Sequence, residues 1–235
     1  MPAVSVTLQP VYGLPNRPTV YASPFDVPPA IPSQWDDEFT SSVLGSKWIV
    51  PTTSGAGCGV ATALGGGWVS VGPAAGLSSR RMFGIRQAAP TGSFTLTAKL
   101  CDSTATVNDD RAGIFVGING GKGNVAGPFR QNVACNAIGV TTASNTADWS
   151  SYDGYQGAAF GSTPANTIAW IRIVWNASAA TLSFYASLNG NAWTNLGSRS
   201  SMSQPDQIGI GIYSNSAATN TSQTIQCDWF RVTTP

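Results

Sequence analysis

The chain has 235 residues, a formal net charge of +1 and no histidine. Charged residues make up 10% of it, against about 25% in an ordinary soluble domain. A molecule so close to neutral gains little from releasing the counterions of a polyanion, which argues against a nucleic-acid partner. No apolar run of about 18 residues is present, which argues against a transmembrane helix and so against a membrane partner.

The opening residues, MPAVSVTLQPVYGLP, lack a basic stretch followed by an apolar one, so they do not have the pattern of a signal peptide. Two interpretations stay open. Either a leader was removed, or the protein is made and used without export. Assembly into a particle in the host cytoplasm fits the second interpretation.

Four cysteines are scattered along the chain, at Cys58, Cys101, Cys135 and Cys227. They form no CxxC pair, and histidine is absent, so the spacing argues against a zinc site. Four cysteines allow three disulfide pairings, and the sequence does not choose among these pairings and buried thiols.

Residues 1–33 differ from the rest because they hold eight of the fifteen prolines. Proline removes a backbone donor and fixes φ, so we expect an extended arm rather than a packed strand. The arm also carries apolar side chains, among them Val4, Leu8, Tyr12 and Phe25. Such an arm needs a partner surface. It either folds back along its own domain or docks on another subunit of an assembly.

From residue 34 to 235 the sequence consists of short alternating runs separated by Gly, Asn, Ser and Pro. This pattern predicts one antiparallel β-sandwich with almost no helix. Three runs have one apolar face, at 94–100 (Phe94, Leu96, Ala98 and Leu100 inward), 181–188 (Leu182, Phe184, Ala186 and Leu188 inward) and 207–213 (Ile208, Ile210 and Ile212). Three more are apolar on both faces and predict central strands, at 112–118, 133–140 and 168–175.

Three segments resemble the concanavalin A-like superfamily of legume lectins, laminin-G-like domains and glucanases. They are WDDEFTSSVLGSKW (35–48), IAWIRIVWNASAATLSFYASLNGNAW (168–193) and IQCDWFRV (225–232). The resemblance implies an all-β, antiparallel jelly-roll sandwich over residues 34–235. It also implies that the closing segment, with Asp228 and Phe230, lies beside the opening segment, with Asp37 and Phe39. The Trp193 position belongs to the family pattern and is expected to pack.

In related glycosidase-like sandwiches a structural calcium ion lies near this junction. The resemblance therefore implicates Asp228 and Glu38 as calcium ligands. The alternative is that both carboxylates only form hydrogen bonds within a loop, because calcium needs about six oxygens and the sequence displays only the carboxylates. No cofactor is otherwise required.

Glycosidases of this fold need two carboxylates on one strand. This chain has a single glutamate, Glu38, in the opening segment, and without histidine it cannot form a Ser-His-Asp or Cys-His arrangement. The Gly-rich stretch 119–124 lacks the Ser or Thr that a phosphate-binding loop requires after Lys122. We therefore expect no enzymatic activity.

One segment, residues 148–157, has the composition of a sugar-binding loop. Sugars need aromatic rings together with planar polar side chains. The candidate glycan ligands are Asp148, Trp149, Tyr152, Asp153, Tyr155 and Gln156. The alternative is that the aromatic residues cover the edge of the sandwich.

Two functional hypotheses follow from the sequence. The first is a virion-associated structural or adhesive protein, such as a phage head decoration or tail component, anchored to other virion or capsid subunits by residues 1–33. It would act as a homo-oligomer or as part of a larger assembly. The second is a carbohydrate-binding module of a secreted or cell-surface bacterial protein, with glycan as partner. A glycoside hydrolase or lyase is the least favoured reading.

Overall fold

In the computed structural model of the chain, the structure describes residues 24–50, 60–64, 67–73, 81–102, 110–118, 125–132, 137–143, 155–156, 168–214 and 225–235. Within these ranges the elements are strands, together with one three-residue 3-10 helix, η1 (Pro24–Asp26). The expected all-β architecture is confirmed, with almost no helix in the described residues. None of the described helical residues forms a helix long and apolar enough to cross a membrane.

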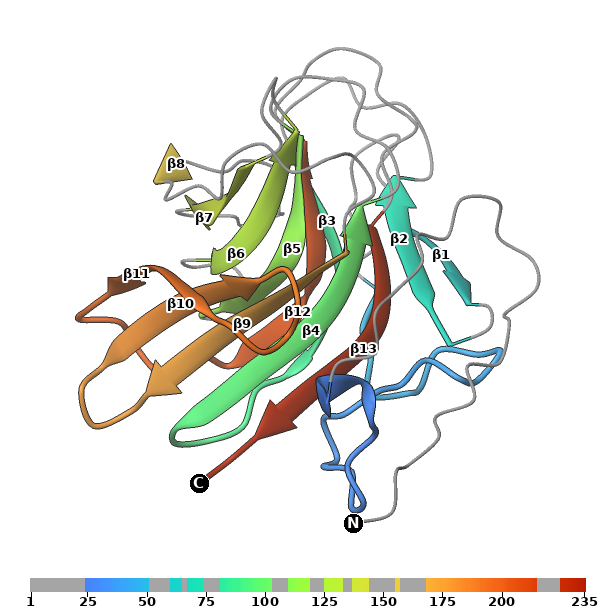
Figure 1. Cartoon of the computed structure of the whole chain (residues 1–235), viewed down its shortest axis with the longest axis horizontal. Coiled ribbons are helices and arrows are strands. Elements are labelled where there is room, and N and C mark those ends of the chain that lie inside the picture. Colours follow the sequence, from blue (N-terminus) through green and yellow to red (C-terminus); the bar gives the residue numbers. More distant parts are fainter. Residues whose placement is uncertain are drawn as a thin grey trace.

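The described strands form two antiparallel sheets that pack face to face (Figure 1). The seven-stranded sheet has the order β1-β2-β13-β4-β9-β10-β11, with β1 (Val60–Leu64), β2 (Val69–Pro73), β13 (Ile225–Thr233), β4 (Phe94–Asp102), β9 (Ile168–Asn176), β10 (Thr181–Ser187) and β11 (Thr194–Arg199). The six-stranded sheet has the order β3-β12-β5-β6-β7-β8, with β3 (Arg81–Ala88), β12 (Gln207–Ser214), β5 (Asp110–Gly117), β6 (Val125–Asn132), β7 (Ala137–Ala143) and β8 (Tyr155–Gln156).

The core lies between the two sheets, and alternate residues of the facing strands fill it. Leu96, Ala98, Ile173, Phe184 and Ile210 are among its members, each at most 1% exposed. The inward sets expected for β4 and β12 are confirmed where side chains are described, and β5 and β9 are central strands as expected.

Two sequence-based expectations need revision. Leu188 was expected to point inward, but β10 ends at Ser187 and Leu188 is 43% exposed in the turn that follows. The alternation stops there because the Ser187 hydroxyl accepts hydrogen bonds from the backbone N–H groups of Asn189 and Gly190. Of the run 133–140, residues 133–136 lie outside the described part, and β7 covers Ala137–Ala143.

The opening segment lies beside the closing strand, as the resemblance implied. Asp37 and Phe230 form an isolated antiparallel bridge with N–O distances of 2.8 and 2.9 Å. The Asp37 carboxylate accepts hydrogen bonds from the Trp48 indole and from the Phe39 backbone N–H, both at 2.8 Å. The Trp48 ring in turn packs against Phe39 and Phe230. A carboxylate and a Trp eleven residues apart thus fasten the segment to the sandwich.

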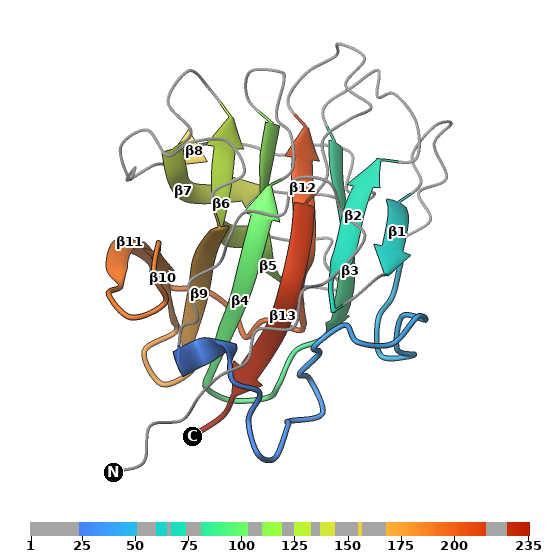
Figure 2. The same ribbon diagram turned by 45° about the vertical axis from the view of Figure 1, so that its right-hand side comes forward.

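Part of the Pro-rich arm contacts the chain's own sandwich. η1 lies over the outer face of the seven-stranded sheet, in front of the lower ends of β9 and β4 (Figure 2). Asp26 pairs with Lys99 of β4, and Phe25 packs edge-on against Trp193. Residues 24–26 therefore follow the fold-back alternative, while docking of the arm on another subunit stays a prediction and residues 1–23 lie outside the described part.

Two of the four cysteines, Cys101 and Cys227, are buried thiols in the described part of the chain. Burial raises the pKa of the Cys227 thiol well above its ordinary value, and the nearby carboxylates act in the same direction. The thiol therefore stays protonated at neutral pH. Cys58 and Cys135 lie outside the described residues.

Gly209 in β12 is a position where only glycine fits. A Cβ atom there would lie 2.3 Å from the carbonyl oxygen of Ile85 and 2.5 Å from the Phe115 ring. We expect Gly209→Ala to lower the free energy of unfolding by about 3 kcal/mol, measured by urea denaturation.

Gly45→Ala is the matched control, because its Cβ would meet nothing closer than 3.9 Å. We expect it to change stability by less than about 0.5 kcal/mol. Equal urea midpoints for the two variants would contradict the packing of β12 against β3 and β5.

Candidate functional site

The residues predicted to bind glycan cannot be joined into a described site. Asp148, Trp149, Tyr152 and Asp153 lie outside the described residues. Tyr155 and Gln156 form β8 at the edge of the six-stranded sheet, where their backbones pair with β7. Their role in binding stays a prediction.

The two predicted calcium ligands each lie next to a cation. Glu38 receives two hydrogen bonds from the Arg231 guanidinium, at 2.7 and 3.0 Å. Asp228 pairs with the Lys99 ammonium at 2.9 Å. Within the described residues, no three of His, Cys, Asp and Glu gather closely enough to hold a metal ion. The calcium ion stays a prediction, and both carboxylates have a structural role without it.

These ion pairs belong to a larger set of side chains on the outer face of the seven-stranded sheet. The register of β13, β4, β9 and β10 aligns this face in rows across the strands. The rows are Trp229–Lys99–Trp170–Ser187, Arg231–Thr97–Arg172–Tyr185 and Thr233–Thr95–Val174–Ser183. Neighbouring rows lie two residues apart along each strand, or about 7 Å.

The first row is built around a buried lysine. Lys99 is 4% exposed, and its ammonium lies 3.0 Å from Asp26, 2.9 Å from Asp228 and 5.5 Å from the centre of the Trp170 ring. Asp26 also accepts a hydrogen bond from the Trp229 indole at 3.3 Å. A buried ammonium is tolerated only when its charge is compensated, and here two carboxylates and a ring face do so.

The second row contains an arginine that stacks on aromatic rings. The guanidinium carbon of Arg172 lies 3.7 Å from the centre of the Trp193 ring and 5.6 Å from that of Phe25. Its Nε donates to the Thr97 hydroxyl at 3.3 Å, and among the described residues no carboxylate lies within ion-pair distance of it. Burial lowers the pKa of Arg172, while nearby Tyr185 acts in the opposite direction. The side chain stays a cation because its ordinary pKa is so high.

Two indole N–H groups of this face are buried without a hydrogen-bond acceptor in the described structure, those of Trp170 and Trp193. Both residues belong to the aromatic cluster around Trp68 and Trp229. A buried donor without an acceptor costs about 1–3 kcal/mol. The two indoles therefore give this face two donors without an acceptor among the described residues.

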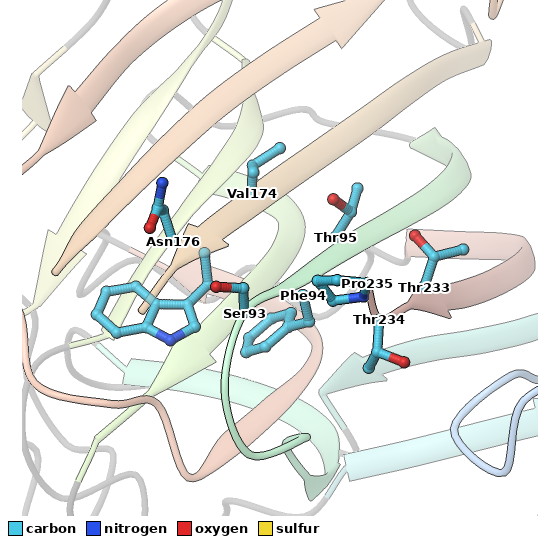
Figure 3. Close-up of a pocket in the computed structure, with 9 residues that line it drawn as sticks. Ser93, Phe94, Thr95, Val174, Asn176, Thr233, Thr234 and Pro235 are labelled. Carbon is cyan, nitrogen blue, oxygen red and sulfur yellow. The ribbon is translucent and has the colours of Figure 1, made fainter. Parts of the chain in front are cut away.

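The third row leads into a pocket of about 310 Å³ at the end of the central strands (Figure 3). Its lining combines the hydroxyl or amide side chains of Ser93, Thr95, Asn176, Thr233 and Thr234 with the apolar Phe94, Val174, Trp175 and Pro235. Phe94 and Trp175 are core residues, each 2% exposed, so they give the lining a fixed position. Figure 3 shows Thr95, Val174 and Thr233 on three neighbouring strands.

Sequence reasoning missed this face, although a signal was present. The run 168–175 was assigned as apolar on both faces, yet Trp170 and Arg172 alternate with the core residues Ala169, Ile171 and Ile173. Alternation in the run 94–100 places Lys99 on the face opposite Leu96, Ala98 and Leu100, but it does not indicate that Lys99 is buried between two carboxylates. The signal in the sequence was a basic residue between inward apolar residues on each of two adjacent central strands, Lys99 in β4 and Arg172 in β9.

No protein-family model matches the sequence, and no curated protein matches it in sequence. Among solved structures, the chain is similar to the GH43 protein BlXynB from Bacillus licheniformis, with 15% identity and a TM-score of 0.59 over 88% of this chain and 40% of that one. It is also similar to a legume lectin-like domain from Entamoeba histolytica (14%, TM-score 0.53, 80% of this chain and 89% of that one). A third similar structure is the Emp47p carbohydrate recognition domain, with 11% identity and a TM-score of 0.52 over 85% of this chain and 95% of that one.

The chain has the concanavalin A-like, lectin-type fold. It spans nearly the whole of the two lectin-type neighbours but only about two fifths of the GH43 protein. At these identities the similarity establishes the arrangement of strands, as the sequence segments implied, and nothing about ligands.

Lys99 is the residue on which this face depends most. Replacing it with methionine leaves the Asp26 and Asp228 carboxylates without their shared cation. We expect Lys99→Met to lower the free energy of unfolding by about 3 kcal/mol and to increase proteolytic cleavage within residues 24–33.

Lys47→Met is the matched control. Lys47 lies 3.5 Å from Asp37 in a pair whose side chains are 29% and 20% exposed, and we expect this partly exposed pair to contribute about 1 kcal/mol or less. If urea denaturation gave the same decrease in the free energy of unfolding for Lys99→Met and Lys47→Met, the Lys99 pairs would not stabilise the sheet more than the Lys47 pair does.

Proposed function

We propose that the protein is a non-catalytic carbohydrate-binding module, and that it binds glycan at the pocket on the outer face of its seven-stranded sheet. The observation that carries this proposal is the lining of that pocket, which combines five residues with hydroxyl or amide side chains and four apolar residues. The volume of about 310 Å³ is at the lower end of the range for small-ligand sites.

Sugars require this combination of groups. A pyranose ring has an apolar face and a rim of hydroxyls, so its site needs apolar surface and polar side chains together. The hydroxyls of Thr95, Thr233 and Thr234 make no hydrogen bond within the described part of the chain and can serve a ligand. The lectin-type fold, which a carbohydrate recognition domain also has, agrees with this proposal.

The described acidic residues on this face support a binding role rather than catalysis. Hydrolysis by this kind of fold uses two carboxylates that flank the scissile bond. Here Glu38 is held by Arg231, and Asp26 and Asp228 are held by Lys99. The single glutamate of the whole sequence is therefore engaged in an ion pair.

The test is binding of the full chain to a panel of immobilised neutral oligosaccharides. Xylohexaose is the first probe because the chain is also similar in structure to a xylan beta-1,4-xylosidase from Bacillus halodurans (13% identity, TM-score 0.59). For the glycan bound best, we expect the double variant Thr95→Val and Thr233→Val to weaken binding roughly thirtyfold, because two hydrogen bonds of about 1 kcal/mol each are lost.

Thr194→Val on β11 is the control, because Thr194 is exposed and lies outside the pocket lining. It should leave the dissociation constant unchanged in isothermal titration calorimetry. If the double variant bound as tightly as the wild type, the pocket would not be the binding site.

A second function, assembly into a virion or another large particle, is favoured by exposed apolar side chains in the described part of the arm. Val27 is 66% exposed and Ile31 is 89% exposed. Isolated exposed apolar residues are common, but these two lie in a proline-rich segment next to the docked η1. The virion and extracellular locations both stay predictions.

Sedimentation of native source material tests the assembly function. We expect the chain to travel with a large particle in fixed stoichiometry, detected by mass spectrometry across a density gradient. Replacing Val27 and Ile31 with serine should release it, while Val43→Ser, at a residue that is 71% exposed outside the arm, should not. A chain that stays at the top of the gradient would contradict assembly.

A further inference from the structure

We infer that the outer face beneath η1 is a second subsite of the proposed glycan-binding surface and that it takes the carboxylate of a uronic acid unit. Asp26 occupies the place of that carboxylate in this structure. This inference rests on the proposed function and names the class of glycan: an acidic polysaccharide.

The contacts of η1 with the sheet include the Phe25 ring, the Asp26 carboxylate and the Phe25 backbone carbonyl, which accepts a hydrogen bond from Arg231. The Asp26 carboxylate lies 3.0 Å from the Lys99 ammonium and 3.3 Å from the Trp229 indole nitrogen. The Phe25 ring lies edge-on to Trp193, with ring centres 6.0 Å apart. A uronic acid unit combines a ring with an apolar face and a carboxylate in one residue, so it presents the two groups that Phe25 and Asp26 supply together.

The face also has donors that Asp26 leaves unused. The indole N–H groups of Trp170 and Trp193 have no acceptor in the described structure. Arg172 stacks on Trp193 and donates from Nε to a hydroxyl, which leaves its terminal N–H groups without a described carboxylate. Trp170 is 3% exposed, so water does not compensate its N–H group. A ligand with a carboxylate and several hydroxyls supplies acceptors for all three side chains.

Charge supports the same ligand. Without Asp26, the described cluster holds three cations, Lys99, Arg172 and Arg231, and two carboxylates, Glu38 and Asp228. Three positive charges against two negative charges leave a surplus of one positive charge. One carboxylate neutralises it, and a neutral sugar does not, so the bare subsite favours an acidic unit.

η1 can leave without breaking the sheet. It is three residues long and none of its residues is buried. It is followed by Pro28, Pro29 and Pro32, and by Val27 and Ile31, which are largely exposed. A ligand that competes with Asp26 therefore displaces a short segment at the surface rather than part of the core.

The subsite and the pocket lie on the same strands. From Thr95 in the pocket to Lys99 in the subsite is four residues of β4, or about 13 Å. Between them lies the row of Arg231, Thr97 and Arg172. A linear acidic oligosaccharide that follows β4 would reach both sites.

The experiment uses the full chain with two matched probes, tetragalacturonate and its fully methyl-esterified form, which has the same rings without the negative charges. By isothermal titration calorimetry, we expect the methyl ester to bind at least tenfold more weakly than the acid. Asp26→Ala should tighten binding of the acid several-fold, because the competing carboxylate is gone.

Arg172→Gln should weaken binding of tetragalacturonate at least tenfold, with its fold checked by urea denaturation. Arg172→Lys is a second variant that keeps the charge and loses the planar fork, and it should give an intermediate loss. Arg199→Gln is the control and should leave binding unchanged, because Arg199 lies at the end of the edge strand β11, paired with Leu182, and not on β13, β4 or β9.

The outcomes separate the inference from the proposed function. If neutral glycans bind and tetragalacturonate does not bind wild type or Asp26→Ala, the inference is wrong and the function stands. If no glycan of either kind binds, both are wrong. If Arg172→Gln leaves the affinity for tetragalacturonate unchanged, tetragalacturonate binds elsewhere and the inference is wrong. If a peptide of residues 24–30 binds the Asp26→Ala protein and tetragalacturonate does not, the face is a docking site for the arm instead.

Discussion

The register of β4 between β13 and β9 is the constraint on which the rest of the structure depends. Because successive side chains of a strand point to opposite faces, this one register sends Leu96, Ala98 and Leu100 into the core and places Thr97 and Lys99 on the outer face. A slip by one residue would exchange the two sets. The core and the candidate binding face are therefore fixed by the same hydrogen bonds.

The outer face of the seven-stranded sheet is not an ordinary solvated surface. Lys99, Trp170 and Trp229 are each at most 4% exposed there, although they lie outside the main core. They are covered by η1, which neutralises the lysine through Asp26. A buried cation with two carboxylates contributes less to stability than apolar packing of the same volume. Its presence over central strands is more easily understood if the face has a function in which η1 takes part.

The opening segment, residues 35–48, is held against the closing strand β13 by its acidic residues. Asp36, Asp37 and Glu38 each contact β13, through the backbone N–H of Val232, through the bridge to Phe230 and through Arg231, respectively. Three successive acidic residues thus act as fasteners between the first and last described segments of the sandwich. This explains why the acidic opening segment need not be a metal site to be structurally important.

The sequence by itself determined the class of fold and the faces of several strands. Alternation in 94–100 and 207–213 and the apolar runs 112–118 and 168–175 were each enough, because period-two burial is a local property of a strand. The pairing of the opening and closing segments was implied by their resemblance to the concanavalin A-like superfamily. The tertiary structure decided what lies on the outer face. Lys99, Arg172 and Trp193 come from three distant segments, and Phe25 and Asp26 from a fourth, so no local pattern relates them. The end of β10 before Leu188 was also outside the reach of alternation, since the Ser187 turn stops the strand. Burial of a charge depends on which side chains surround it in space, and only the folded sheet brings those side chains together.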